Sequence, residues 1–284
     1  MTSEVGTASL PIIEEDHFVE VEGCPIHWRA RGHREAGAVV LIHGGGANLH
    51  WWDAVIPGLR SDRRIVTVDL SGHGLSGKRP TYSASLWTKE IEVVLGRATA
   101  GTASLVGHSM GGRVAVAAAP ALGRRVESLI LVDVPIELGE AAARSGRRAT
   151  GARVHRSVED ARLAFRLLPD QPVARPDVLA AIVENSIGEV PGGWSVRADP
   201  RVFFRIPDRV VIECLGKVEC PVGLIRAGKG EYLNPGAVAQ IEGLLEAPVT
   251  LLEVPHAHHH VMLDDPEALA EAIETLLSYK EYTS

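Results

Sequence analysis

The sequence predicts an α/β fold in which helices cover both faces of a mostly parallel, eight-stranded sheet. Short, largely apolar runs recur along the chain, as at 38–42 and 128–132, and are typical of strands buried on both faces. Segments with helical patterning separate these runs, and such alternation is characteristic of a parallel sheet between helices. Third, this alternation of strand and helix patterns breaks between Pro135 and Val218, which divides the chain into a core and an inserted segment.

The expected strands begin with two short alternating segments that Glu22-Gly23 joins as an antiparallel hairpin. All eight are expected at 18–21, 25–30, 38–42, 64–68, 104–106, 128–132, 222–225 and 249–254. Helices are expected at 83–98, 112–122, 235–245 and 266–277. Asp265 is a suitable N-cap for the last helix, and Pro266 suits its first position.

Residues 135–218 are expected to form a helical lid inserted into a core made of 1–134 and 219–284. This stretch lacks buried-strand runs and carries helical patterns interrupted by Pro and Gly. Its first part holds seven arginines: Arg144, Arg147, Arg148, Arg153, Arg156, Arg162 and Arg166. Nearby acidic residues favour a solvated helix face for them, and an anion-binding surface for a carboxylate-bearing substrate is the alternative.

Composition limits the classes of function. The 284 residues are 45% hydrophobic and 23% charged, as in a globular protein with a sizeable core, and the net charge of −7 argues against binding to nucleic acid or anionic membranes. No apolar run is long enough to span a bilayer, and the N-terminus lacks a signal-peptide pattern. Cys24, Cys214 and Cys220 suit reduced thiols better than a disulfide framework. We therefore expect a cytoplasmic protein with a small-molecule substrate; the oligomeric state is not predicted.

Gly107-His108-Ser109-Met110-Gly111 is the most informative stretch of the chain. It lies between an expected strand and an expected helix, so the chain must turn sharply at Ser109. Glycine is required where a Cβ would clash in such a turn. The turn would expose the Ser109 hydroxyl above a helix N-terminus, which favours negative charge. The motif therefore predicts a nucleophilic serine.

A serine nucleophile needs a base, an acid that orients the base, and donors for the oxyanion. Candidates follow three other expected strands, and the carboxyl ends of parallel strands meet at one edge of the sheet. They are the glycine-rich run 43–46, the loop 226–231 and the histidine-rich run 256–260. Their order along the chain, with the acid between Ser109 and the histidines, is that associated with a Gly-x-Ser-x-Gly elbow.

These motifs resemble those of the α/β-hydrolase superfamily, in its capped branch. The resemblance covers most of 18–280 outside the lid and rests on His43-Gly44-Gly45-Gly46 with Trp52, Asp69 to Ser76, Gly107 to Gly111, Gly228 to Glu231, and His259 with Asp264 to Pro266. It implies that His259 is the base and that Glu231 is the acid. Asp133, which follows the strand 128–132, is the alternative acid, because some relatives place the acid there.

Gly45 and Met110 are expected to donate the two N–H groups of the oxyanion hole, and Trp51, Gly44 and His108 to bind substrate. No metal and no cofactor are expected, because consecutive histidines do not converge easily on one ion. The expected activity is hydrolysis of a carboxylic ester or lactone through an acyl-enzyme. Carbon–carbon bond hydrolysis of a diketone, or a slow-turnover ligand receptor, is the alternative.

Overall fold

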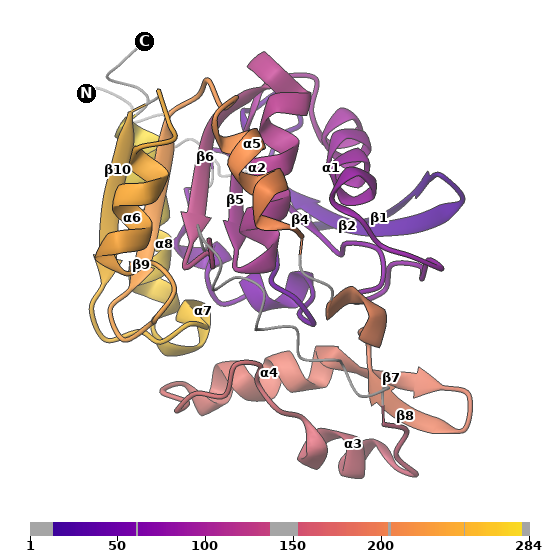
Figure 1. Ribbon diagram of the computed structural model, residues 1–284. Coiled ribbons are helices and arrows are strands. Elements are labelled where there is room, and N and C mark those ends of the chain that lie inside the picture. Colours follow the sequence, from indigo (N-terminus) through magenta and orange to yellow (C-terminus); the bar gives the residue numbers. More distant parts are fainter. Residues whose placement is uncertain (1–13, 61, 137–152, 204–205, 247, 280–284) are drawn as a thin grey trace, which may run out of the picture.

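An eight-stranded sheet forms the centre of the computed structural model, which describes residues 14–60, 62–136, 153–203, 206–246 and 248–279 (Figure 1). Its strands are β1 (Glu14–Val21), β2 (Cys24–Arg31), β3 (Ala38–Ile42), β4 (Arg64–Val68), β5 (Ala103–His108), β6 (Val126–Val132), β9 (Val222–Ala227) and β10 (Val249–Val254). They lie in the order β1-β2-β4-β3-β5-β6-β9-β10. From β4 to β10 all neighbours are parallel, so the predicted fold class is confirmed.

The antiparallel part of the sheet is the hairpin of β1 and β2, with β2 also antiparallel to β4. Glu22 and Gly23 both have positive φ, at 47° and 73°, as a two-residue hairpin turn of matching twist requires.

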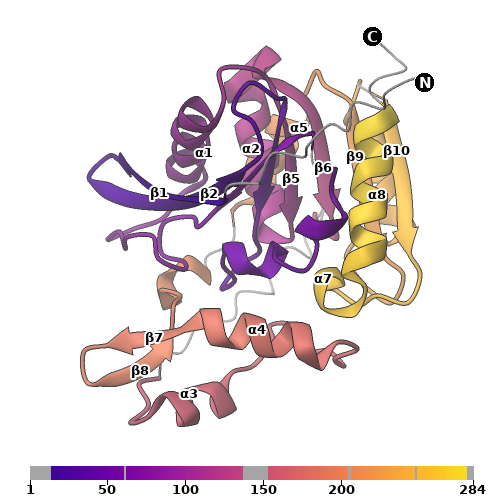
Figure 2. The same cartoon turned by 180° about the vertical axis from the view of Figure 1, so that it is seen from behind.

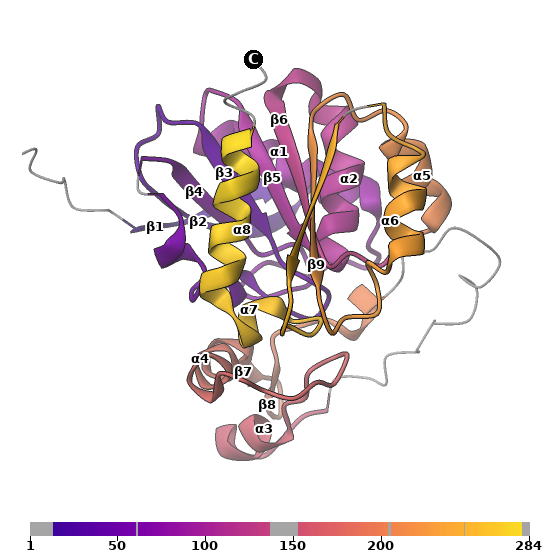
Figure 3. The same cartoon turned by 90° about the vertical axis from the view of Figure 1, so that its left-hand side faces the viewer.

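Helices cover both faces of the sheet. One face carries α1 (Ala84–Ala98), α2 (Met110–Leu122), α5 (Asp208–Leu215) and α6 (Pro235–Glu242) (Figure 1). The other carries α8 (Pro266–Tyr279), with α7 (Val261–Asp264) before it and the 3-10 helices η1 (Leu49–Trp52) and η2 (Ile56–Gly58) nearby (Figures 2 and 3). Within the described ranges, no helix is both long and apolar enough to cross a bilayer.

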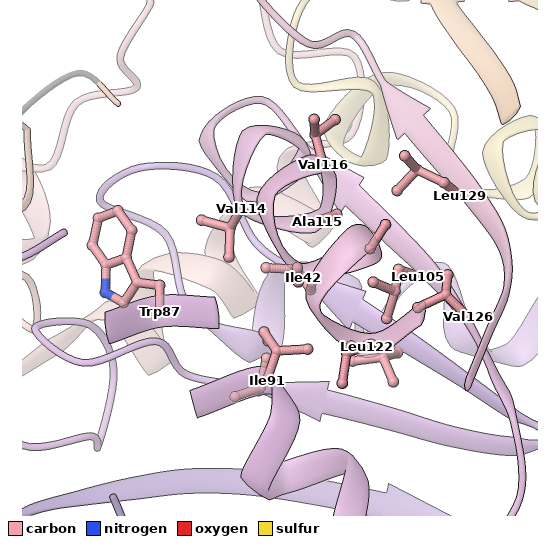
Figure 4. Close-up of a cluster of buried hydrophobic side chains, with 14 of the residues drawn as sticks. Ile42, Trp87, Ile91, Leu105, Val114, Ala115, Val116, Leu122, Val126 and Leu129 are labelled. Atoms are coloured by element: carbon pink, nitrogen blue, oxygen red, sulfur yellow. The ribbon is translucent and has the colours of Figure 1, made fainter. Parts of the chain in front are cut away.

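Each face has its own hydrophobic core, because successive strand residues point to opposite sides. Val40 and Ile42 of β3 belong to the cluster with Trp87 and Ile91 of α1, part of which Figure 4 shows. Val39 and Leu41 join the cluster that contains Trp52 and the buried residues of α8. A strand with apolar residues on both sides is therefore fixed in depth and register, and so is the loop that follows it.

The segment between β6 and β9 contains a part that we call the insert, residues 153–203. It comprises α3 (Val158–Ala164), α4 (Pro176–Ser186), β7 (Ile187–Val190), β8 (Gly193–Val196) and the 3-10 helix η5 (Pro200–Phe203). Figure 1 shows it beyond the carboxyl ends of the strands. Asn48 of the core donates to Ser186 Oγ (3.0 Å), and the backbone of His260 bonds to the Gln171 side chain (2.7 Å).

Two features of this region differ from the expected helical lid. The pair β7–β8 is a half-exposed hairpin turned at Pro191 and Gly192, so it lacks the apolar run by which the other strands were recognised. Helix α5 lies inside the expected boundary 135–218 but packs along α2, where Asp208 accepts from Arg113 (2.7 Å). Arg144, Arg147 and Arg148 lie outside the described residues.

Candidate active site

Ser109 is the single residue between the end of β5 and the start of α2. Its φ of 52° and ψ of −120° are unusual for a residue with a side chain and mark a strained turn. A Cβ at Gly107 would lie 2.5 Å from the Gly111 carbonyl oxygen, and a Cβ at Gly111 would lie 2.4 Å from that of His43. The two glycines therefore allow the turn, which holds the Ser109 side chain out of the core.

The His259 ring connects Ser109 to a carboxylate. Its Nε2 is 3.0 Å from Ser109 Oγ, and its Nδ1 is 2.7 Å from Asp133 Oδ2. Asp133 is fully buried, and His259 is 6% exposed. An ionised carboxylate only accepts hydrogen bonds, so Nδ1 carries the proton and Nε2 presents a lone pair to the serine hydroxyl. The three side chains form a hydrogen-bonded chain from Ser109 through His259 to Asp133, which we call the relay.

The carboxylate in this relay is the alternative acid of the sequence analysis, and the expectation that Glu231 lies against His259 is wrong. After β9 the chain turns at once, with Gly230 N–H donating to Ala227 O (2.9 Å), and the Glu231 side chain is exposed. A Cβ at Gly230 would lie 3.0 Å from Asp133 Oδ2, so this turn packs directly on the Asp133 carboxylate, which takes the position expected for Glu231. Asp133 follows β6, the sheet neighbour of β5, with a φ of 43°.

Burial sets the protonation states of the relay. It raises the pKa of Asp133 to about 6 and lowers the pKa of His259 to about 4. At neutral pH the carboxylate is therefore ionised and the imidazole is neutral. A neutral imidazole with a free Nε2 lone pair can accept a proton from Ser109.

Two further histidines surround the His259 ring. His108 Nε2 donates to the backbone carbonyl of His259 (2.9 Å), and His260 Nε2 donates to that of Pro169 (3.0 Å). Burial lowers the pKa of both, so both rings are neutral. One ring nitrogen from each of His108, His259 and His260 lies within 4.8 Å of the others, so within the described residues this is the group that could hold a metal ion. Metal binding there would compete with the relay for His259.

The loop after β3 lies beside the start of α2. A Cβ at Gly44 would lie 2.9 Å from His108 Nδ1, and one at Gly45 would lie 3.5 Å from Met110 Sδ. His43 orders the loop, because its Nδ1 donates to Gly44 O (2.7 Å) while its Nε2 accepts from Leu70 N–H (3.2 Å). The two expected oxyanion-hole residues are thus neighbours, and the Met110 N–H is in the first helical turn, where N–H groups lack helical partners.

The loop that begins at Asp69 supports the site from below. The buried Asp69 carboxylate accepts from the N–H groups of Leu49 (2.8 Å) and Leu75 (2.9 Å) and from the ring of His27 (2.7 Å). A bridge between His73 and Ala198 then joins this loop to the insert. The loop that begins at Asp69 is thus hydrogen-bonded to the segment after β3 and to the insert.

A cavity of about 300 Å³ separates the glycine loop from the insert. Gly45, Gly46 and Trp51 line it on the core side, and eleven residues of the insert, between Arg153 and Pro200, contribute the rest. Trp51 is 5% exposed and meets the His260 ring edge-on at 5.2 Å between centroids. Of the residues expected to bind substrate, Trp51 therefore faces this cavity, whereas Gly44 and His108 are not part of its lining and pack against each other.

The chain resembles known hydrolases in sequence and structure. It is 30% identical over 253 residues to the esterase Rv0045c of Mycobacterium tuberculosis, covering 85% of this chain and 83% of that protein. A solved structure of Rv0045c matches with a TM-score of 0.73 and 26% identity, covering 94% of this chain and 92% of that one. A 2-(acetamidomethylene)succinate hydrolase of Mesorhizobium japonicum is 27% identical over 279 residues, covering 93% of this chain and 97% of that protein.

The family model described as "Alpha/beta hydrolase family" matches residues 39–272, which run from the glycine loop through the relay to α8. These residues contain Ser109, His259, Asp133 and the glycine loop. The chain therefore belongs to the alpha/beta hydrolase family.

Proposed function

We propose that the protein is a serine hydrolase that cleaves carboxylic esters or lactones of small organic molecules through an acyl-enzyme. The observation that carries the proposal is the relay from Ser109 through His259 to Asp133, with distances of 3.0 and 2.7 Å. The esterase activity in the name of the Rv0045c relative also supports it.

In the first half-reaction Ser109 Oγ attacks the carbonyl carbon, and its proton passes to His259 Nε2. Asp133 accepts from Nδ1–H, which fixes the tautomer and stabilises the imidazolium. The N–H groups of Gly45 and Met110 donate to the oxyanion of the tetrahedral intermediate. His259 Nε2–H then protonates the leaving alkoxide oxygen, and the Ser109 ester remains.

In the second half-reaction His259 Nε2 takes a proton from water, whose oxygen attacks the same carbonyl carbon. Collapse of this intermediate returns the proton to Ser109 Oγ and releases the carboxylic acid. The cavity beside Gly45 would hold part of the substrate, with the insert acting as its lid. No step needs a metal ion or an organic cofactor.

The test is intact-mass spectrometry after treatment with a fluorophosphonate, which phosphonylates activated serines. The wild type is expected to gain one adduct, and the variant Ser109→Ala is expected to gain none and to lose ester hydrolysis while keeping its circular dichroism spectrum. Ester turnover that survives in folded Ser109→Ala protein would exclude the covalent mechanism.

A further inference from the structure

The charge of the cavity next to the glycine loop is opposite to that of the whole chain. Lys and Arg number 29 in the chain against 36 Asp and Glu. The described residues that line the cavity nevertheless include Arg153 and Arg166 and no carboxylate. His155 lies in the same wall. Because the surrounding protein is acidic, this local excess of cations distinguishes the cavity from an average part of the surface.

Both arginines lie in the insert, and among the described residues no carboxylate pairs with either of them. Arg166 Nη1 donates to the carbonyl oxygens of Leu163 and Phe165, each at 2.7 Å. The main-chain carbonyl of Arg153 accepts from Ser195 Oγ (3.0 Å), which ties that backbone to β8. Within the described parts of the chain, neither guanidinium has an ion pair. As far as the described residues go, each guanidinium therefore has N–H donors available to a ligand.

Two other arginines between 153 and 166, Arg156 and Arg162, differ from Arg153 and Arg166. Arg162 pairs with Glu184, and Arg156, which is exposed like Arg153 and Arg166, does not line the cavity. The interpretation as a solvated helix face therefore suits Arg156 and Arg162, whereas Arg153 and Arg166 suit an anion-binding surface.

The rest of the lining is mostly apolar; it does not include Ser109 or His259, but it adjoins residues next to them. Trp51, Phe165 and Leu167 provide apolar walls. Trp51 contacts the ring of His260, next to His259, and Gly45 lies against Met110, next to Ser109. A substrate whose carbonyl lies at Ser109 can therefore extend past Gly45, with an apolar chain on the aromatic walls and its far end at the arginines.

We propose that the preferred substrates are esters or lactones that also carry a free carboxylate, which Arg153 and Arg166 bind. The proposal rests on the proposed function and names its substrate class. A guanidinium presents parallel N–H donors that match the two oxygens of a carboxylate, and such charge-assisted hydrogen bonds are stronger than neutral ones. The carboxylate does not react; it orients the substrate so that the ester carbonyl faces Ser109.

The first experiment compares kcat/KM for mono(4-nitrophenyl) adipate and 4-nitrophenyl hexanoate, which share the reacting ester and chain length and differ in the terminal carboxylate. The wild type is expected to prefer the adipate by about tenfold, as a hydrogen-bonded charge in a partly solvated site allows. The double variant Arg153→Gln/Arg166→Gln is expected to bring the ratio close to one. Arg156→Gln removes the same charge outside the cavity and is expected to keep the wild-type ratio.

A second measurement does not need turnover. Isothermal titration of monomethyl adipate and methyl hexanoate into Ser109→Ala protein is expected to show tighter binding of the adipate, and adding Arg153→Gln/Arg166→Gln is expected to remove the difference. Equal binding, or a preference that Arg156→Gln reduces as much as the double variant does, would overturn the carboxylate site. Failure of the proposed function is recognised separately, because the wild type would then show no fluorophosphonate adduct.

Discussion

The loops after β6 and β9 leave neighbouring strands at the same edge of the sheet, and each carries an acidic residue. Asp133 follows β6 directly and is fully buried, 2.7 Å from His259. Glu231 comes four residues after β9, beyond a glycine turn, and is exposed. A position at the correct end of a strand is therefore not sufficient: the carboxylate must also point inward from a backbone held against its neighbours.

Removing each acid in turn is expected to have the largest and most different effects. Asp133→Asn is expected to lower kcat about 10⁴-fold, because an amide opposite Nδ1 no longer fixes the tautomer or stabilises the imidazolium. Glu231→Gln removes an exposed charge and is expected to stay within about twofold of the wild type. Steady-state hydrolysis of 4-nitrophenyl hexanoate measures both. The reverse ranking would assign the role to Glu231.

The contact between the two loops can be tested without removing either acid. A Cβ at Gly230 would lie 2.9 Å from Ala227 Cβ and 3.0 Å from Asp133 Oδ2. Gly230→Ala is therefore expected to displace the carboxylate from His259 and to lower kcat about 10- to 100-fold.

Gly216→Ala is the matched control for this change, since the nearest atom to its added Cβ would be 3.8 Å away. It is expected to leave kcat unchanged. Full activity in folded Gly230→Ala protein would mean that the position of Asp133 does not control the rate.

The dependence of activity on pH also distinguishes Asp133 from Glu231. Burial lowers the pKa of His259 to about 4 and raises that of Asp133 to about 6, and the pair titrates in macroscopic steps. Protonation of the relay removes the base, so kcat/KM is expected to fall as the pH drops from about 6 towards about 4. At pH 6.5, where half of an ordinary histidine is protonated, most of the activity is expected to remain.

The measurement is a profile of kcat/KM from pH 4 to 9. An acidic midpoint at or above pH 6.5 would contradict a buried, neutral His259. Glu231→Gln is expected to leave this midpoint in place, because its exposed carboxylate does not face the ring.

The sequence predicts the sheet and part of the site well, for physical reasons. Residues 38–42 and 128–132 are apolar on both sides, as strands between two helical layers must be. The turn at Ser109 could be predicted because Gly107 and Gly111 are required by contacts closer than 3 Å to other backbone atoms. His259 could be identified because its motif with Asp264 to Pro266 resembles that of the α/β-hydrolase superfamily, and Pro266 does start α8.

The acid and the insert were harder to predict. Both acidic residues follow strands, and the choice depends on the depth and direction of each side chain, which the pattern of residue types does not encode. The hairpin β7–β8 is short and half exposed, so packing rather than a buried apolar run defines it. The different roles proposed for Arg153 and Arg166 and for Arg156 likewise depend on which side chains line the cavity.

The most direct test of the relay is the rate at which a fluorophosphonate labels Ser109, followed by intact mass, in the Asp133→Asn and Glu231→Gln variants. Ser109→Ala serves as the blank. We expect Glu231→Gln to be labelled at the wild-type rate and Asp133→Asn to be labelled orders of magnitude more slowly. Labelling of Asp133→Asn at the wild-type rate would contradict the assignment of Asp133 as the residue that activates Ser109 through His259.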